Sequence, residues 1–351
     1  MIRVLVVDDS ALVRKTLSEQ LGKFADIVVV GTAIDPYNAR DLIVNLKPDV
    51  VTLDIEMPRM DGLSFLAKLM KHYPLPVVIV SSLSPKNSEM AIRALELGAV
   101  EVIHKPGSQY AVADLGRELA HAIRAAAKSR PLLSLPAAPP RPVRKAPAGK
   151  VVFSTTAKVL AIGGSTGGTT ALEAILTRLP AAIPGTVVVL HMPEHFTTAL
   201  AERLDAICAM EIREAHDGDV ITKGVALIAP GGHHLVVERS GARYLARIKD
   251  GPMVHHQRPA VDVLFNSMAD SVGQNALGVL LTGMGADGAQ GLLAMRRAGA
   301  RTLVQDEATS VVFGMPKEAI KLGAAEEIVP LPEIADAILR VFEEAENAGA
   351  A

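Results

Sequence analysis

Residues 158–176 read KVLAIGGSTGGTTALEAIL, and this stretch decides the fold of the second half of the chain. The apolar run at 158–162 predicts a short buried strand, and residues 169–176 predict a helix. The glycine pairs between them predict a tight loop. Ser165 is therefore expected at the carboxyl end of a strand, where it is either an exposed nucleophile or part of a phosphate-binding loop.

The first 125 residues repeat this alternation of short apolar runs and amphipathic stretches. The runs lie at 2–7, 27–32, 50–53, 77–80 and 100–103. Helix-like stretches between them include 10–21, 36–47, 64–71 and 88–97. Alternating strands and helices predict a doubly wound α/β domain with a five-stranded parallel sheet of the flavodoxin-like type.

The second region of alternation begins near residue 157. Its predicted strands are 159–162, 186–190, 225–228, 277–281 and 301–305, with a β-hairpin around 234–248 that turns at Gly241. We therefore predict an α/β domain at 1–125, a second doubly wound α/β domain with a hairpin at 157–345, and a basic linker rich in proline and alanine at 126–156.

The composition is that of an ordinary soluble protein. The 351 residues are 49% hydrophobic and 21% charged, with a net charge of −2 and a single cysteine, Cys208. The near-neutral charge and the lack of a basic recognition helix argue against nucleic-acid binding. No apolar run approaches the roughly 20 residues that span a bilayer, and no signal segment precedes the first strand. We expect a cytoplasmic protein without membrane insertion.

Polar side chains follow several predicted strands of the first domain. Asp8 and Asp9 follow the first strand, Asp54 the third and Ser81 the fourth, while Lys105 follows the fifth. The carboxyl ends of parallel strands meet at one edge of a sheet, so these groups should converge. Carboxylates suit Mg²⁺, one carboxylate can accept a phosphoryl group, and the lysine and serine can bind its oxygens.

These residues resemble a response regulator receiver domain. The matching segments are LVVDDS (5–10), LDIEMP (53–58) with Asp61-Gly62, VSS (80–82) and HKP (104–106). The resemblance implies that Asp54 accepts phosphate from a histidine kinase and that Asp8, Asp9, Asp54 and the backbone carbonyl of Glu56 hold Mg²⁺. It also implies that Ser81 and Lys105 bind the phosphate. Val102 stands where many receivers have an aromatic switch residue.

The residues after the next strands decide between the two roles of Ser165. A P-loop requires a lysine that residues 163–170 lack, and a dinucleotide fold favours an acidic residue where this chain has His191. Asp287 lies in the glycine-rich loop after the strand at 277–281. We therefore predict a Ser165–His191–Asp287 triad, with backbone N–H groups near Thr166 and Met284 stabilising the oxyanion.

The histidine pairs of the second domain are weaker candidates for a site. His233-His234 and His255-His256 are neighbours in the chain. Adjacent side chains of extended chain point to opposite faces, so such a pair chelates one metal poorly. We expect no metal or other cofactor at the site of the triad.

Residues 157–345 resemble the catalytic domain of the CheB family of chemotaxis methylesterases. The matching segments are AIGGSTGG (161–168), HMP (191–193), APGGHHL (229–235), RPAVDVLF (258–265) and LTGMGADG (281–288). The resemblance implies hydrolysis of glutamate methyl esters on chemotaxis receptors with release of methanol, deamidation of receptor glutamines, activation by phosphorylation, and recruitment to receptor arrays. The alternatives are a receiver-controlled serine esterase or amidase with another substrate, and a receiver with a non-catalytic binding domain.

Overall fold

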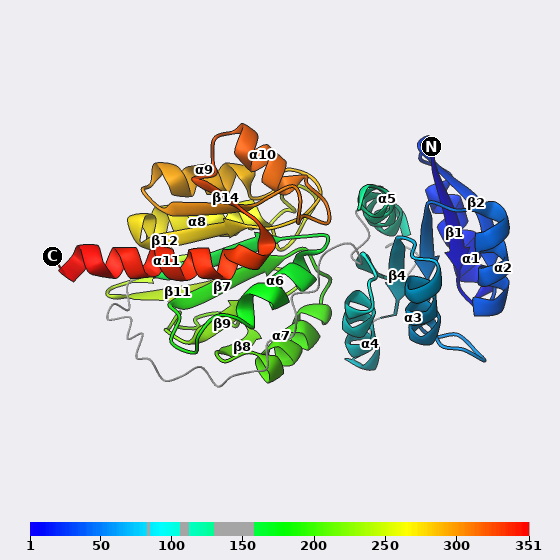
Figure 1. The fold of residues 1–351 in the computed structure, drawn as a ribbon, viewed down its shortest axis with the longest axis horizontal. Helices are drawn as coiled ribbons and strands as arrows, with labels where there is room; N and C mark the ends of the chain where they lie inside the picture. Colours follow the sequence, from blue (N-terminus) through cyan, green and yellow to red (C-terminus); the bar gives the residue numbers. More distant parts are fainter. Residues whose placement is uncertain (83–84, 106–111, 130–157, 351) are drawn as a thin grey trace. The chain divides into compact units, whose positions relative to one another are not determined.

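The computed structural model describes residues 1–82, 85–105, 112–129 and 158–350 (Figure 1). The chain divides into two compact units, Met1–Leu135 and Pro136–Ala351, and each is described by itself. Most of the linker predicted at 126–156 lies outside the described residues.

The first unit is built on a parallel sheet of five strands in the order β2-β1-β3-β4-β5, which confirms the predicted fold class. Polar residues cap its first helices: Ser10 accepts a hydrogen bond from the N–H of Val13, and Asp35 accepts one from the N–H of Tyr37. The elements are β1 (Ile2–Val7), α1 (Ala11–Leu21), β2 (Ile27–Ala33), α2 (Pro36–Leu46), β3 (Val50–Leu53), α3 (Gly62–His72), β4 (Val77–Ser81), α4 (Pro85–Glu96), β5 (Glu101–His104) and α5 (Val112–Lys128).

The second unit is built on a parallel sheet of seven strands in the order β14-β13-β12-β6-β7-β9-β8. Its strands are β6 (Val159–Gly164), β7 (Gly185–Leu190), β8 (Glu211–Glu214), β9 (Val225–Ile228), β12 (Ala276–Leu280), β13 (Arg301–Gln305) and β14 (Glu327–Val329). The helices are α6 (Gly168–Leu176), α7 (Phe196–Ile207), α8 (Val261–Ser271), η3 (Gly273–Asn275), α9 (Ala289–Arg297), α10 (Met315–Lys321) and α11 (Leu331–Ala350). The doubly wound prediction is confirmed, although β8 and β14 at the two edges were not predicted.

The predicted hairpin is present as β10 (His234–Ser240) and β11 (Arg243–Lys249), an antiparallel pair outside the main sheet. Its turn contains Gly241 at a φ of 60°, in the left-handed region that glycine adopts without strain. Residues 250–260 connect the hairpin to α8, so the position of the hairpin constrains where that helix begins.

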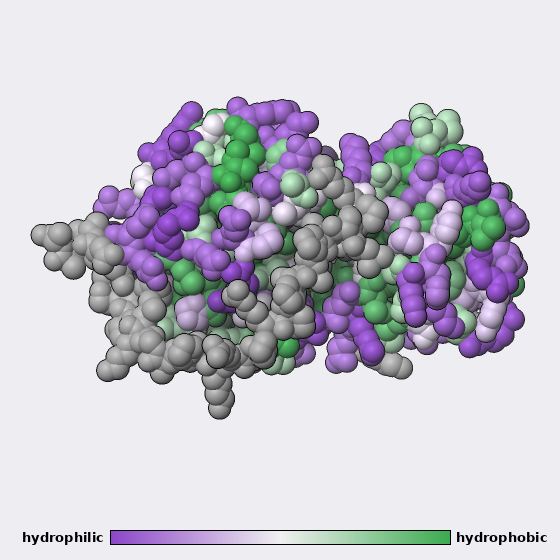
Figure 2. Space-filling view, in the orientation of Figure 1, coloured by the Kyte–Doolittle hydropathy of each residue, from purple (hydrophilic) through white to green (hydrophobic). Residues whose placement is uncertain are grey.

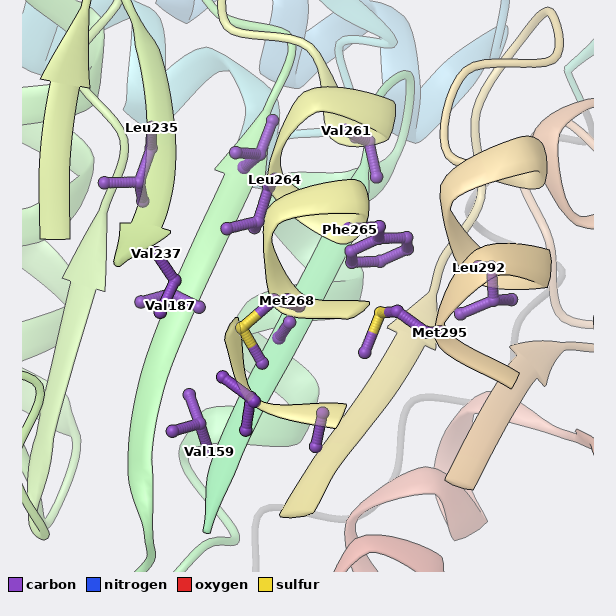
Figure 3. Close-up of a cluster of buried hydrophobic side chains, with 14 of the residues drawn as sticks. Val159, Val187, Leu235, Val237, Val261, Leu264, Phe265, Met268, Leu292 and Met295 are labelled. Carbon is purple, nitrogen blue, oxygen red and sulfur yellow. The ribbon is translucent and has the colours of Figure 1, made fainter. Parts of the chain in front are cut away.

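Helices cover both faces of the seven-stranded sheet (Figure 1). The central strands β6, β7 and β12 are buried along their whole length, as expected for a parallel sheet covered on both sides. Figure 3 shows Leu264, Phe265 and Met268 of α8 packed among side chains of the sheet, of the hairpin and of α9. These contacts fix the position of α8 over β6 and β12.

Gly163 near the end of β6 allows α8 to approach this closely. A Cβ atom on Gly163 would lie 2.2 Å from Cγ1 of Val261, the first residue of α8. The missing side chain therefore brings the N-terminus of α8 against β6, the strand that ends just before Ser165.

The surface is mixed. On the face drawn in Figure 2, hydrophilic side chains cover most of the described surface and hydrophobic side chains form separate patches. Among the helices that the structure describes, none combines the length and the apolar composition that a membrane crossing requires.

Candidate active site

Ser165 lies in the loop between β6 and α6, at the centre of the seven-stranded sheet. Strand β6 is the point at which the chain reverses its direction across the sheet, because β7 lies on one side of it and β12 on the other. The loop is held in place by the loop after β12, since the N–H of Ser165 donates to the carbonyl of Thr282 over 3.0 Å. Such a switch point is where ligands bind in open α/β sheets.

His191 follows β7 and lies directly beside Ser165. Its Nδ1 is 3.1 Å from the Oγ of Ser165, and its Nε2 is 2.7 Å from Oδ2 of Asp287. An ionised carboxylate can only accept, so Nε2 carries the proton and Nδ1 offers a lone pair to the serine hydroxyl. In the familiar serine hydrolase triad Nε2 faces the serine, so the imidazole here is used in the opposite sense.

Asp287 is held by the chain around it. Its side chain is 2% exposed. Oδ2 accepts from the N–H of Val261 over 2.7 Å, and Oδ1 accepts from the N–H groups of Asp262 and Gly288 over 2.8 and 2.9 Å. Burial acts to raise the pKa of Asp287, but the hydrogen bond and charge of His191 and these backbone donors lower it below its ordinary value. The carboxylate therefore stays ionised beside the imidazole.

The structure thus brings the three residues of the predicted triad together at the ends of three neighbouring strands. Ser165 is 8% exposed, and the side chain of His191 is 4% exposed. The arrangement can move a proton from a hydroxyl to an imidazole that a carboxylate orients, which is the chemistry of nucleophilic acyl transfer.

The two predicted oxyanion positions lie next to Ser165. Thr166 follows it directly, and Met284 follows Gly283, on which a Cβ atom would lie 2.8 Å from the Cβ of Ser165. The N–H of Ser165 itself is used by Thr282. Within the described residues, the N–H of Met284 has no protein acceptor.

Sequence reasoning missed a buried network behind the nucleophile. Oε1 of Gln305 accepts from the N–H of Thr282 over 2.8 Å, and the Thr282 hydroxyl donates to the carbonyl of Thr166 over 3.0 Å. Gln305 is fully buried and is the last residue of β13. The polar Gln305 at the end of the predicted strand 301–305 was the feature of the sequence that could have indicated this network.

The histidine pairs do not share ligands. His233 bonds to Asp250 over 2.7 Å, and His234 bonds to the carbonyl of Pro252 over 3.0 Å and to the N–H of Ala260 over 3.3 Å. His255 bonds to Asp262 over 2.9 Å. Each imidazole of these three therefore has a partner of its own.

In the first unit, the predicted acidic residues also converge. Carboxylate oxygens of Asp8, Asp9 and Asp54 lie within 4.8 Å of one another. Lys105 pairs with Asp8 over 2.7 Å and with Asp54 over 2.8 Å. Burial raises the pKa of Asp54 to about 6, against the lowering effect of Lys105.

The other receiver residues lie around this cluster. The N–H of Glu56 faces Oδ1 of Asp54 at 3.4 Å, so Glu56 belongs to the loop that follows Asp54 and borders the cluster. Ser81 is 1% exposed, and within the described residues its hydroxyl has no hydrogen-bond partner.

This donor set fits the predicted cation. Three carboxylates so close together repel one another, and a divalent cation with oxygen ligands relieves that repulsion. The unpaired hydroxyl of Ser81 is available for a phosphate oxygen. Asp8, Asp9, Asp54 and the Glu56 carbonyl would hold Mg²⁺.

The chain is similar to known proteins along nearly its whole length. Residues 160–338 match the family model described as CheB methylesterase, and residues 4–115 match the response regulator receiver domain. A protein-glutamate methylesterase/protein-glutamine glutaminase from Syntrophus aciditrophicus is 56% identical over 340 residues, which cover 97% of this chain and 99% of that protein. Another of that name, from Rhodospirillum rubrum, is 53% identical over 97% of this chain and 98% of its own length.

Among solved structures, the CheB methylesterase catalytic domain of Thermotoga maritima is similar, with a TM-score of 0.52 and 34% identity. The match covers 53% of this chain and all of that domain. The chain therefore belongs to the CheB methylesterase family and carries a response regulator receiver domain before its methylesterase domain.

Proposed function

We propose that this protein is a phosphorylation-activated enzyme that hydrolyses γ-methyl esters of glutamate side chains and deamidates glutamine side chains of chemotaxis receptors. The observation that carries the proposal is the hydrogen-bonded chain Ser165–His191–Asp287, with lengths of 3.1 and 2.7 Å. The names of relatives at 50–56% identity over nearly the whole chain support the substrate class.

Hydrolysis begins at Ser165. The serine hydroxyl gives its proton to Nδ1 of His191 while Oγ attacks the γ-carbonyl carbon of the methylated glutamate. The tetrahedral intermediate collapses to an acyl-serine ester as Nδ1 returns the proton to the departing methanol. Water then attacks the acyl-enzyme with His191 as base, which releases glutamate and restores Ser165. With a glutamine side chain, ammonia leaves in place of methanol.

Two groups of the chain stabilise the charges that form. Asp287 orients the imidazole and stabilises the imidazolium that forms during each proton transfer. The N–H groups of Thr166 and Met284 are the proposed donors to the oxyanion. Removing one donor of this kind typically costs about 10²–10³ in kcat.

The receiver supplies the control. Asp54 is the proposed phosphate acceptor, and Lys105 and Ser81 bind the oxygens of the new phosphoryl group. Mg²⁺, when bound by Asp8, Asp9, Asp54 and the Glu56 carbonyl, neutralises charge so that a carboxylate can meet a phosphate. The new charge on Asp54 then biases a two-state element of the protein toward the active form.

The partners follow from these two activities. A chemotaxis histidine kinase is the proposed phosphodonor, and methyl-accepting chemotaxis receptors are the proposed substrate. We propose that the protein lies in the cytoplasm and is recruited to receptor arrays through these partners.

The substrate class is tested with two kinds of ester. Full-length protein is incubated with methylated receptor membranes and, separately, with a small activated ester. The proposal predicts methanol release from the membranes and a mass increase of one unit at receptor glutamines as they become glutamates. Hydrolysis of the small ester without either change in the receptor would instead support an esterase with another substrate.

A further inference from the structure

A second histidine–carboxylate pair lies directly beside the triad. Nε2 of His255 is 2.9 Å from Oδ2 of Asp262, whose side chain is 7% exposed. One ring nitrogen of His255, one carboxylate oxygen of Asp262 and one of Asp287 all lie within 4.8 Å of one another. The triad aspartate therefore has a buried carboxylate neighbour that the mechanism above does not use.

Asp262 connects the first turns of two helices. Its N–H, in the first turn of α8, donates to Oδ1 of Asp287 over 2.8 Å. Its own Oδ1 accepts from the N–H of Gly291, in the first turn of α9, over 2.7 Å. The absence of a side chain at Gly291 permits this approach, since a Cβ atom there would lie 3.2 Å from the Cα of Asp262. The same residue thus orders the backbone that holds Asp287 and fixes it against α9.

The neighbouring carboxylates experience opposite electrostatic effects. Burial raises the pKa of Asp262, and the charge of Asp287 raises it further, whereas His255 and the N–H of Gly291 act against the rise. The pKa of Asp287 is lowered instead, through His191 and the backbone donors. His255 is therefore the side chain that offsets charge on the second carboxylate.

The backbone at His255 is strained. His255 and His256 have φ angles of 52° and 63°, in a turn closed by paired hydrogen bonds between Val254 and Gln257. The left-handed region is unfavourable for a residue other than glycine. Within the described residues, His255 reaches a carboxylate while His256 forms no hydrogen bond or ion pair. The hydrogen bond between His255 and Asp262 thus helps to stabilise the left-handed conformation of the turn.

The group is not suited to a cation. The two oxygens of Asp287 accept from His191, Val261, Asp262 and Gly288. These four donors use the lone pairs that a metal would need.

We propose that Asp262 and His255 are positioning residues for the triad, an inference that rests on the proposed esterase function. Asp262 fixes the first turn of α8 so that its N–H groups point at Asp287. His255 offsets the charge of Asp262, so that Asp287 is the carboxylate that orients His191.

Three variants of the full-length protein separate these roles. In His255→Asn, the asparagine tolerates the left-handed region, but its side chain is too short to reach the position of Nε2 beside Asp262. His256→Asn makes the same change in the same turn, at a histidine without a carboxylate partner in the described structure. Asp262→Asn keeps the shape and an oxygen for the N–H of Gly291 but removes the charge.

The assay is methanol release from methylated receptor membranes in the presence of acetyl phosphate and Mg²⁺. We expect His255→Asn and Asp262→Asn to lower kcat by about ten-fold each with KM within about two-fold. The first removes the partner of the Asp262 carboxylate. The second replaces the charged acceptor for the N–H of Gly291 with a weaker neutral one, which loosens the first turn of α8. His256→Asn should stay within about two-fold of the wild type in both constants.

The pH profile adds a readout that a structural role would not move. The titratable groups around Asp287 are His191 after β7, Asp262 in α8 and His255 in the loop before it. The acid limb of kcat/KM records protonation of the essential base. Loss of the Asp262 charge should move this limb to lower pH, and loss of His255 should move it to higher pH, each by roughly half a unit to one unit.

Thermal unfolding separates positioning from folding. The pKa of Asp262 in the folded protein lies above its ordinary value of 3.8. In the pH interval between the pKa of the unfolded state and that of the folded state, the folded state therefore binds more protons than the unfolded state. Stability of the wild type therefore falls as pH rises through the interval and stays lower at neutral pH. Asp262→Asn should unfold at the same or a higher temperature than the wild type at about pH 7.5, and this difference should shrink toward about pH 4.

The outcomes are distinguishable. If the wild type and His256→Asn release methanol while His255→Asn and Asp262→Asn match them in kcat and pH profile, the positioning role is wrong and the esterase function stands. The same conclusion follows if the acid limb of kcat/KM moves in the same direction in His255→Asn and in Asp262→Asn. If the wild type releases no methanol, the proposed function fails first.

Discussion

Asp287 shows how much of the site depends on a single carboxylate. It accepts one hydrogen bond from His191 and three from the backbone of Val261, Asp262 and Gly288. Because every acceptor position is filled, the carboxylate cannot rotate away from the imidazole. A fixed carboxylate places the imidazole proton on Nε2, and this leaves Nδ1 free to accept the proton of Ser165.

Asp287→Asn is expected to lower kcat by about 10³–10⁴. An amide at this position would direct an NH₂ group at a backbone N–H or at His191, so the imidazole would lose its orienting acceptor. The measurement is methanol release under saturating substrate, with circular dichroism to confirm that the variant is folded.

Asp250→Asn is the matched control for this change. Asp250 bonds to His233 over 2.7 Å, the same length as the bond between Asp287 and His191, but outside the triad. Its loss should leave kcat within about two-fold of the wild type. An Asp287→Asn protein with comparable activity would show that the carboxylate is not needed.

At the residue scale, the sequence predicts the groups that follow strand ends. Ser165, His191 and Asp287 each follow a strand recognisable from its apolar run, so their convergence could be inferred. Gln305 also ends a predicted strand, but neither its partner nor that of Asp262 could be identified from the sequence. Their partners are Gly291 in α9 and Thr282 in the loop after β12, and these contacts depend on how closely the elements pack.

The elements themselves differ in how readily the sequence reveals them. Strands β6, β7 and β12 are buried on both faces and form continuous apolar runs. The edge strands β8 and β14 are short, contain charged residues and pair with one neighbour only, so they lack that signal. These segments are strands because they form hydrogen bonds with the neighbouring strand, and residue propensities for β-structure do not predict such pairing.

Helix α8 is the element that connects the core to the site. Its apolar residues pack in the cluster of Figure 3, while the N–H groups of its first turn point at Asp287. The close approach of Val261 to Gly163 therefore determines where the triad carboxylate lies.

Gly163→Ala is expected to destabilise the protein by about 1–3 kcal/mol, because the new Cβ meets Val261. The displaced helix should also lower kcat by about ten-fold or more, since Asp287 moves with it. Adding Val261→Ala removes the atoms that clash and should restore part of both losses. Urea unfolding and methanol release measure the two effects.

Gly241→Ala serves as the control for this pair. Gly241 lies in the hairpin turn, and an added Cβ there meets no atom within 4 Å. The φ of 60° makes alanine cost about 1–2 kcal/mol, but kcat should not change. If Gly163→Ala behaved like Gly241→Ala in the activity assay, the position of α8 would not control the site.

The whole molecule uses one architectural rule twice. Each unit has a parallel sheet whose chain reverses direction beside its first strand, and each carries its reactive groups after the strands at that point. This repetition could be predicted because alternating strands and helices leave few topologies. The placement of individual loops could not, since it depends on contacts such as those of Asp262 that are distant in sequence.

Asp54→Ala is expected to abolish activation by acetyl phosphate and to leave basal methanol release within about two-fold of the wild type. The variant lacks the proposed phosphate acceptor but retains the triad. Removal of Mg²⁺ with EDTA should have the same effect on the wild type, because the acidic cluster needs a cation to admit phosphate. Loss of basal methanol release in either case would contradict the proposal that the receiver domain controls activation only and that the triad supplies the basal activity.

The most direct test of the proposed enzyme is the dependence of methanol release on Ser165. Full-length wild type and Ser165→Ala are each incubated with methylated receptor membranes, acetyl phosphate and Mg²⁺, and released methanol is measured. We predict rapid release by the wild type and a rate below about one-thousandth of it for Ser165→Ala. Release by Ser165→Ala at the wild-type rate would contradict a serine nucleophile at this site.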